Sequence, residues 1–118
     1  KVGLVTNTTR LTFTKIQTFI NIDDYFPYVL TVTEAKEPKP SPIPYLQAMD
    51  FLSLSPDETL IIEDSKTGLL SAVKSNANVF GITTSLTKNK IKEIDKKIMI
   101  ANSYKDIERF LKNYKGQK

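Results

Sequence analysis

The chain has 118 residues, of which 40% are hydrophobic and 25% charged, and its formal net charge at pH 7 is +4. This length and composition suit one soluble globular domain, or part of one, and exclude a disordered chain and a membrane span. Without cysteine or histidine, the chain can form no disulfide, thiolate nucleophile, Ser-His-Asp triad or Cys/His zinc site. Phosphate chemistry and metal sites built from oxygen ligands remain.

The net positive charge comes mostly from lysines scattered over the second half and the C-terminal tail, with no dense basic patch interleaved with aromatic residues. We therefore expect no binding to nucleic acid and none to a membrane. The absence of cysteine fits a reducing cytoplasm, and no secretory leader is visible. The first residue, Lys1, lies directly in an apolar stretch without an initiator methionine, so we expect that further polypeptide precedes it.

Five short runs rich in β-branched residues predict strands, and segments with helical periodicity separate them. The strands are expected at 2–6, 28–32, 59–63, 79–83 and 97–101. Several of these runs are apolar without alternation, which is typical of strands buried on both faces. Strands that alternate with helices predict an α/β fold with a parallel sheet covered by helices.

Apolar residues at helical spacing predict the faces that the helices bury. The stripes are Phe13, Ile16 and Ile20; Tyr45, Leu46, Met49 and Leu52; Leu69, Leu70, Val73 and Ala77; and Ile107, Phe110, Leu111 and Tyr114. Capping signals agree with them. Ser55-Pro56-Asp57-Glu58 predicts one helical turn before the third strand, and Ser65 is expected to cap the helix that follows it.

Polar residues follow the first predicted strand, where open α/β sheets bind ligands. Thr6 and Asn7 end this strand, and a helix expected to start near Thr8 would present a hydroxyl and backbone N–H groups to a phosphate. Threonine and asparagine also commonly cap helices, so a purely structural role stays open at this stage.

Two adjacent carboxylates, Glu63 and Asp64, end the third predicted strand. Neighbouring negative charges at the edge of a core repel each other and lose hydration, and a bound cation would offset that cost. Oxygen-only ligands suit Mg²⁺, which takes one or two carboxylates together with water and substrate phosphate. The alternative is that Asp64 merely caps the next helix.

Lys39 lies between prolines, after Glu37, in the run EPKPSPIP, and these prolines restrict its backbone. An ammonium group held there would neutralise phosphoryl oxygens as charge develops during transfer. An exposed, merely solubilising lysine is the alternative.

Three motifs in this order resemble the second, third and fourth motifs of the haloacid dehalogenase-like hydrolases. They are Thr6-Asn7, Lys39-Pro40-Ser41-Pro42 with Tyr45, and Ile61-Ile62-Glu63-Asp64-Ser65 with Gly68. The chain is most similar to the branch that contains β-phosphoglucomutase and phosphoglycolate phosphatase, and the resemblance covers nearly all of residues 1–118. It implies a Rossmann-like, doubly wound and mostly parallel sheet.

The resemblance also implies a role for each site residue. The Thr6 hydroxyl and the backbone beside Asn7 would bind the transferring phosphoryl group, and Lys39 would hold its charge near the nucleophile. Asp64, assisted by Glu63, would anchor Mg²⁺. The implied activity is a Mg²⁺-dependent phosphatase or phosphomutase that forms an aspartyl-phosphate with a small phosphorylated metabolite, such as a sugar phosphate.

Two features of the family have no counterpart in residues 1–118. One is the DxDxT motif, which supplies the nucleophile and the general acid/base, and the other is the helical cap inserted between the first and second motifs. The chain therefore resembles the C-terminal portion of the family's core domain, truncated and without a second domain. We expect this polypeptide alone to be inactive.

The nucleophile strand of the family lies between the strands that end here at Thr6 and Glu63. We expect those strands either to close up or to receive a strand from another chain, so that the polypeptide self-associates or is held by a complementing N-terminal segment. A non-catalytic binding or regulatory module that keeps only the fold is the alternative function. A two-component receiver domain fits less well, because its acidic residues come in another order. Asn76, where the family has glycine, is compatible with a left-handed helix end.

Overall fold

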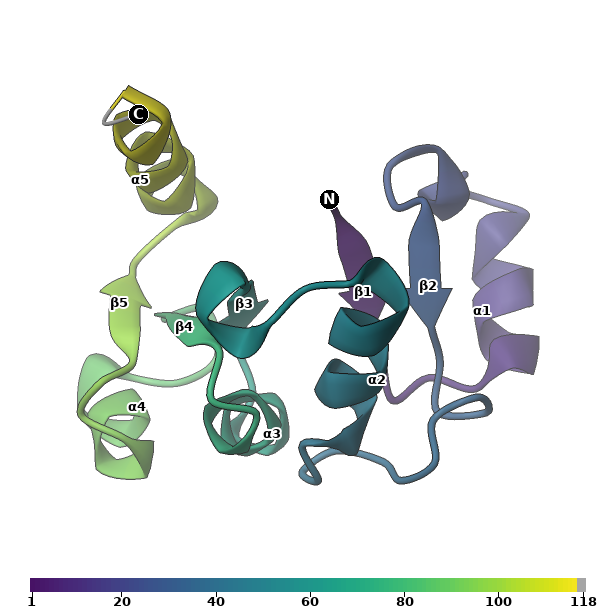
Figure 1. The fold of residues 1–118 in the computed structure, drawn as a ribbon, viewed down its shortest axis with the longest axis horizontal. Coiled ribbons are helices and arrows are strands. Elements are labelled where there is room, and N and C mark those ends of the chain that lie inside the picture. The colour runs from purple at the N-terminus through teal and green to yellow at the C-terminus, as the bar shows by residue number, and fades with distance from the viewer. Residues whose placement is uncertain (117–118) are drawn as a thin grey trace.

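The structure is a computed structural model that describes the backbone of residues 1–116 and the side chains of residues 1–114. Its strands are β1 (Gly3–Val5), β2 (Tyr28–Leu30), β3 (Leu60–Glu63), β4 (Asn78–Ile82) and β5 (Met99–Ala101). Every pair is parallel, with β1 beside β2 in one sheet and the order β3-β4-β5 in the other (Figure 1). The α/β fold with parallel strands is confirmed, and each predicted strand is present with slightly different limits.

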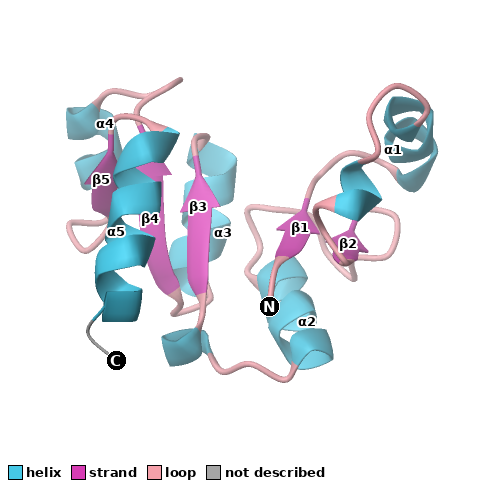
Figure 2. Ribbon diagram, turned by 90° about the horizontal axis from the view of Figure 1, so that it is seen from above, coloured by secondary structure: helices cyan, strands magenta, loops and turns pink. Residues whose placement is uncertain are grey.

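The strands form two sheets, and β1 and β3 are their inner edges. Figure 2 shows these two strands running in the same direction with β2 and β4 on their outer sides. Among residues 1–116 no strand pairing joins β1 to β3. The two strands have therefore not closed up into one sheet.

The helices are α1 (Arg10–Gln17), α2 (Ile43–Leu52), α3 (Lys66–Lys74), α4 (Lys88–Ile94) and α5 (Tyr104–Gly116). In both views α5 covers one face of the β3-β4-β5 sheet and α3 and α4 cover the other, so this sheet is wound on both sides (Figures 1 and 2). The helix α2 lies between the two sheets, in contact with β1 and β2 as well as α3. It is the helix that connects the two parts.

The predicted capping signals are confirmed. The Ser65 side chain accepts a hydrogen bond from the Gly68 N–H at the start of α3, and Ser55 and Glu58 form a capping box around the short helical turn Pro56–Glu58. Asn76 follows α3 with a φ of 67°, the left-handed conformation expected for it. These local signals were readable because they depend on neighbours in the sequence.

The core consists of two clusters on either side of the β3-β4-β5 sheet. The larger includes Leu69, Ile91 and Ile98 together with Tyr45 and Met49 of α2. The smaller lies under α5 and comprises Phe80, Ile82, Ala101 and Ile107. Both faces of this sheet are thus buried, which explains why its strands lack alternation.

Several residues predicted for the core are exposed instead. In the first stripe only Phe13 is buried, while Ile16 and Ile20 face solvent and Ile20 lies beyond the end of α1. Leu46 of α2 and Leu111 and Tyr114 of α5 are also exposed. Among the described residues, no helix is long and apolar enough to cross a membrane.

Candidate functional site

The loops after β1 and β2 meet through Asn7 and Lys39. The Asn7 side chain donates its Nδ2 to the Lys39 carbonyl oxygen at 3.3 Å and accepts the Lys39 backbone N–H at 3.1 Å. The side-chain amide of Asn7 thus pairs with both backbone polar groups of Lys39, as a neighbouring strand would. The predicted site residues Asn7 and Lys39 are therefore neighbours, and the Asn7 side chain is committed to the lysine loop.

The Lys39 ammonium lies where the inner strands of the two sheets end. Its Nζ donates to the Val5 carbonyl oxygen at 2.9 Å and to the Glu63 carboxylate at 3.2 and 3.4 Å. The two side chains are largely buried, with 8% of Lys39 and 14% of Glu63 exposed. The Lys39 ammonium therefore joins the end of β1 to the end of β3, and Glu63 is its counter-charge.

Tyr45 supports this ion pair from α2. Its ring centroid lies 5.0 Å from the Lys39 Nζ, and its phenol is hydrogen-bonded to Glu63. Burial raises the pKa of Tyr45 well above its usual range, and the negative charge of Glu63 and the hydrogen bond to it raise this pKa further. The phenol thus stays protonated and donates to the carboxylate.

Gly68, in the first turn of α3, is where Glu63 approaches the helix most closely. A Cβ atom at this position would overlap the Glu63 carboxylate. Only glycine lets α3 pack this closely to the ion pair. Gly68 therefore permits close packing of α3 behind the site.

Thr6 lies at the end of β1, with its backbone N–H donated to the Leu30 carbonyl oxygen at 3.0 Å. Its hydroxyl oxygen accepts the Thr8 N–H at 3.1 Å, which leaves the hydroxyl proton for another acceptor, such as a phosphoryl oxygen. The helix α1 begins at Arg10 with Thr9 as its N-cap, two residues later than the predicted start near Thr8.

Asp64 follows Glu63 and faces the loop after β4. Its Oδ2 accepts hydrogen bonds from the Thr84 hydroxyl at 3.2 Å and the Ser85 hydroxyl at 3.5 Å. Because Ser65 caps α3, the alternative of Asp64 as that cap is wrong. The contacts with Thr84 and Ser85 were not predicted from the sequence, although both residues come just after a strand whose carboxyl end lies beside that of β3.

The carboxylates at the end of β3 are too few to enclose a metal ion completely, but their number and type suit Mg²⁺. Within the described part of the chain, no group of three or more His, Cys, Asp or Glu side chains could hold a metal. Glu63 and Asp64 are adjacent carboxylates, and Mg²⁺ uses one or two carboxylates with water and phosphate completing its shell. Asp64 is the better candidate ligand, because Glu63 is already paired with Lys39.

Comparison with known proteins agrees with the motif order. The model of a family described as haloacid dehalogenase-like hydrolase matches residues 1–82. The pyrophosphatase PpaX of Bacillus cereus is 27% identical over 86 residues, which cover 73% of this chain and 40% of that protein. PpaX of Anoxybacillus flavithermus gives the same identity and coverage. The match to this chain thus spans about 40% of the length of these curated relatives.

Solved structures resemble the fold over most of the chain. A Thermotoga maritima protein assigned as a beta-phosphoglucomutase matches with a TM-score of 0.82 and 24% identity, over 96% of this chain and 52% of that one. A HAD-superfamily hydrolase of subfamily IA from Geobacter sulfurreducens matches with a TM-score of 0.73 and 23% identity, over 92% of this chain and 48% of that one. At these identities the likeness concerns the fold alone.

Proposed function

Because the chain belongs to the haloacid dehalogenase-like hydrolases, we propose that it is part of a Mg²⁺-dependent phosphatase acting on a small phosphorylated metabolite, such as a sugar phosphate. The observation that carries the proposal is the Lys39 ammonium, held 3.2 Å from Glu63 where β1 and β3 end. The chain would supply the phosphate-binding, lysine and metal-site groups, which are Thr6, Asn7, Lys39, Glu63 and Asp64. Polypeptide outside residues 1–118 would supply the nucleophilic aspartate.

Each of these side chains has a distinct task in the proposed reaction. The Thr6 hydroxyl would donate its proton to a phosphoryl oxygen, since its oxygen already accepts the Thr8 N–H. Lys39 would neutralise charge on the phosphoryl oxygens, and its two fixed partners, Val5 and Glu63, hold the ammonium in place before substrate arrives. Asp64 would hold Mg²⁺ with Glu63 beside it, and the ion when bound would supply further charge neutralisation.

The unpaired inner edges of β1 and β3 support a proposal about partners. Both edges present backbone groups without a strand partner among the described residues, which favours pairing with a further strand. We place a complementing segment, or a second copy of the chain, between them. The protein would work in the cytoplasm, on a small phosphorylated metabolite rather than on nucleic acid.

Inorganic pyrophosphate is a second candidate substrate. The curated relatives are named pyrophosphatases, whereas the sugar-phosphate proposal comes from the motif resemblance. Release of phosphate from pyrophosphate and from a panel of sugar phosphates, at equal Mg²⁺ concentration, distinguishes the two substrates.

An activity assay tests the proposal. The 118-residue chain with Mg²⁺ and an aryl phosphate is expected to show no turnover, and turnover would overturn the assignment of the nucleophile to other polypeptide. In the full-length protein, Lys39→Ala should slow phosphoryl transfer by at least about a hundredfold, and Asp64→Asn should weaken both Mg²⁺ binding and activity. Lys36→Ala is the matched control, because Lys36 lies in the same loop and is exposed to solvent. Unchanged rates in both site variants would contradict the assignment of Lys39 and Asp64 to the site.

A further inference from the structure

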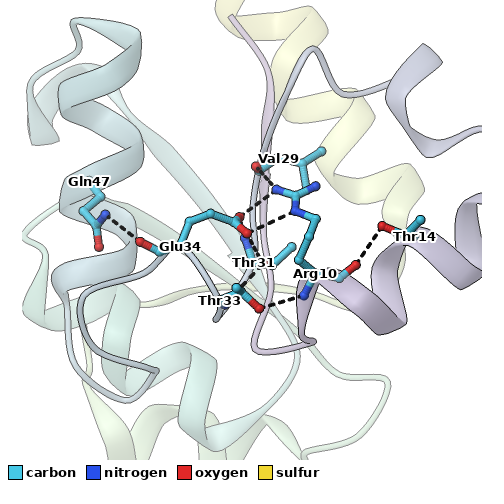
Figure 3. A network of polar contacts seen from close by, with 7 residues as sticks. All are labelled: Arg10, Thr14, Val29, Thr31, Thr33, Glu34 and Gln47. Carbon is cyan, nitrogen blue, oxygen red and sulfur yellow. Dashed lines mark hydrogen bonds and ion pairs between the residues drawn. The ribbon is translucent and has the colours of Figure 1, made fainter.

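A second polar network lies beside the candidate site, at the start of α1 (Figure 3). The Arg10 guanidinium donates to both carboxylate oxygens of Glu34, from Nη2 at 2.6 Å and from Nε at 3.1 Å. The same Nη2 also donates to the Val29 carbonyl oxygen in β2 at 3.1 Å. Arg10 therefore ties the first residue of α1 both to β2 and to the loop that follows it.

Glu34 is fixed from the other side by Thr31, which is fully buried. Its carboxylate accepts the Thr31 backbone N–H at 2.9 Å and the Thr31 hydroxyl at 2.8 Å. The hydrogen bond from Arg10 is the main cause that lowers the pKa of Glu34 to about 2, and the bonds from Thr31 lower it further. The carboxylate is thus charged and fully hydrogen-bonded at neutral pH.

The partial exposure of the pair would ordinarily argue for a small effect. The Arg10 and Glu34 side chains are 40% and 37% exposed, and isolated ion pairs at such positions contribute little. Two features set this pair apart. The guanidinium and carboxylate meet in a two-pronged arrangement, and a further bond from the Arg10 backbone N–H to the Thr33 hydroxyl, at 2.9 Å, closes the network.

The network is attached to α2 as well. Gln47 accepts the Lys36 backbone N–H at 2.7 Å and donates to the Glu34 carbonyl oxygen at 3.4 Å. Residues 34–36 are thus held between α1 and α2, three residues before Lys39. The chain from β2 to Lys39 has one anchor at Glu34 and a second at the Asn7–Lys39 bonds.

We propose that Arg10 and Glu34 are positioning residues of the candidate site. Arg10 follows the turn that carries Thr6 and Asn7, and Glu34 lies in the loop that carries Lys39, so their ion pair sets how the two loops face each other. It acts through the Asn7–Lys39 contact and does not touch the reacting groups. Only the consequence for phosphate binding rests on the proposed function, because the coupling between the loops is a property of the chain itself.

Hydrogen exchange measured by NMR on the 118-residue chain tests this coupling directly. The Lys39 N–H is protected by its bond to Asn7. In Glu34→Gln, exchange at Lys39 should accelerate about tenfold more than exchange at the amides of β4, since loss of the charged partner loosens this loop more than the packed core. The Asn7 side-chain amide resonances should shift at the same time. Arg10→Lys, which keeps the charge but not the two-pronged geometry, should show a smaller change of the same kind.

Glu108→Gln is the matched control, because it removes the exposed ion pair with Lys112 on α5. It should leave exchange at Lys39 and the Asn7 resonances unchanged. Equal acceleration at Lys39 and in β4 would mean that Glu34 serves overall stability only and would overturn the inference, as would no change at Lys39. If Glu34→Gln does not fold, Arg10→Lys gives the same comparison. Neither readout depends on phosphatase activity, so failure of the proposed function would leave the result intact.

Discussion

The two sheets of this protein are stabilised in different ways. Around β3, β4 and β5 the helices bury a continuous apolar core, in which Leu69 is 0% exposed. Around β1, β2 and α1 the buried apolar residues are few, while Leu11 is 69% and Phe19 88% exposed. There the polar network of Arg10 and Glu34 makes many of the connections between elements. The region of β1, β2 and α1, called the first part below, therefore depends on directional hydrogen bonds. The region of β3, β4 and β5, called the second part, depends on apolar packing.

The first part is also attached to the second through only a few groups. The helix α2 contributes Tyr45 and Met49 to the core under β3, while Lys39 joins the end of β1 to Glu63. A region with little buried apolar area should open at a lower free energy than the packed core. The hydroxyl of the buried Ser71 in α3 also donates to the Ser41 carbonyl oxygen at 2.6 Å. The residues of the candidate site come from both parts, so its geometry depends on how firmly these attachments hold.

The largest predicted difference in the free energy of unfolding comes from replacing a leucine by alanine in each of the two parts. Leu69→Ala should lower the free energy of unfolding by about 3 kcal/mol, because it opens a cavity in a fully buried position. Leu11→Ala, on the exposed face of α1, should change it by less than about 0.5 kcal/mol. Urea unfolding followed by circular dichroism measures both. Equal losses would show that α1 is covered in solution.

The next effect concerns the ion pair that bridges the two parts. Lys39→Met should destabilise the chain by about 2 kcal/mol, because it leaves the buried Glu63 carboxylate without its cation. The double variant Lys39→Met with Glu63→Gln should recover part of this loss, since no uncompensated charge remains. Lys112→Met, in an exposed pair, is the control and should have almost no effect. A double variant less stable than Lys39→Met alone would contradict this account.

Local sequence signals predicted the elements of both parts but not how well each is buried. The strands and the caps at Ser65 and Asn76 follow from residue types and short spacings. Periodicity shows which residues share a helix face, and it cannot show whether another element covers that face. For this reason Phe13 was correctly placed in the core, whereas Ile16 on the same stripe is exposed.

The sequence predicted which residues form the candidate site, but it predicted fewer of the contacts around them. Strand ends and motif order singled out Asn7, Lys39 and Glu63, which the structure brings into contact. The pairing of Arg10 with Glu34 was not predicted, because both are ordinary surface charges 24 residues apart in the sequence. No local rule relates such a pair, so only the three-dimensional placement of α1 beside β2 reveals it.

Acid should weaken the first part through Glu34. Its folded-state pKa is lowered from 4.5 to about 2, so its contribution to stability is complete above about pH 4.5 and is lost as the pH falls toward 2. Glu34→Gln should therefore cost about 1 kcal/mol at neutral pH, a value reduced for solvent screening, and the difference from the parent should disappear toward pH 2. Urea unfolding at several pH values measures this. Adding Arg10→Gln to Glu34→Gln should cost little more, and a large further loss would show that Arg10 acts mainly through Val29.

The smallest predicted effect compares the ends of α2 and α3. Ser53 and Asn76 follow these helices with φ values of 57° and 67°, in the left-handed region that glycine adopts without strain. Asparagine tolerates this region better than serine, so Ser53→Gly should stabilise the chain by about 0.5 kcal/mol, whereas Asn76→Gly should be close to neutral. Thermal unfolding of the two variants, with Ser53→Ala as the control for loss of the hydroxyl, tests the order. Because α2 connects the two sheets, a stabilised helix end there should also slow exchange in β1, and a gain confined to α2 would mean that the helix holds β1 only loosely.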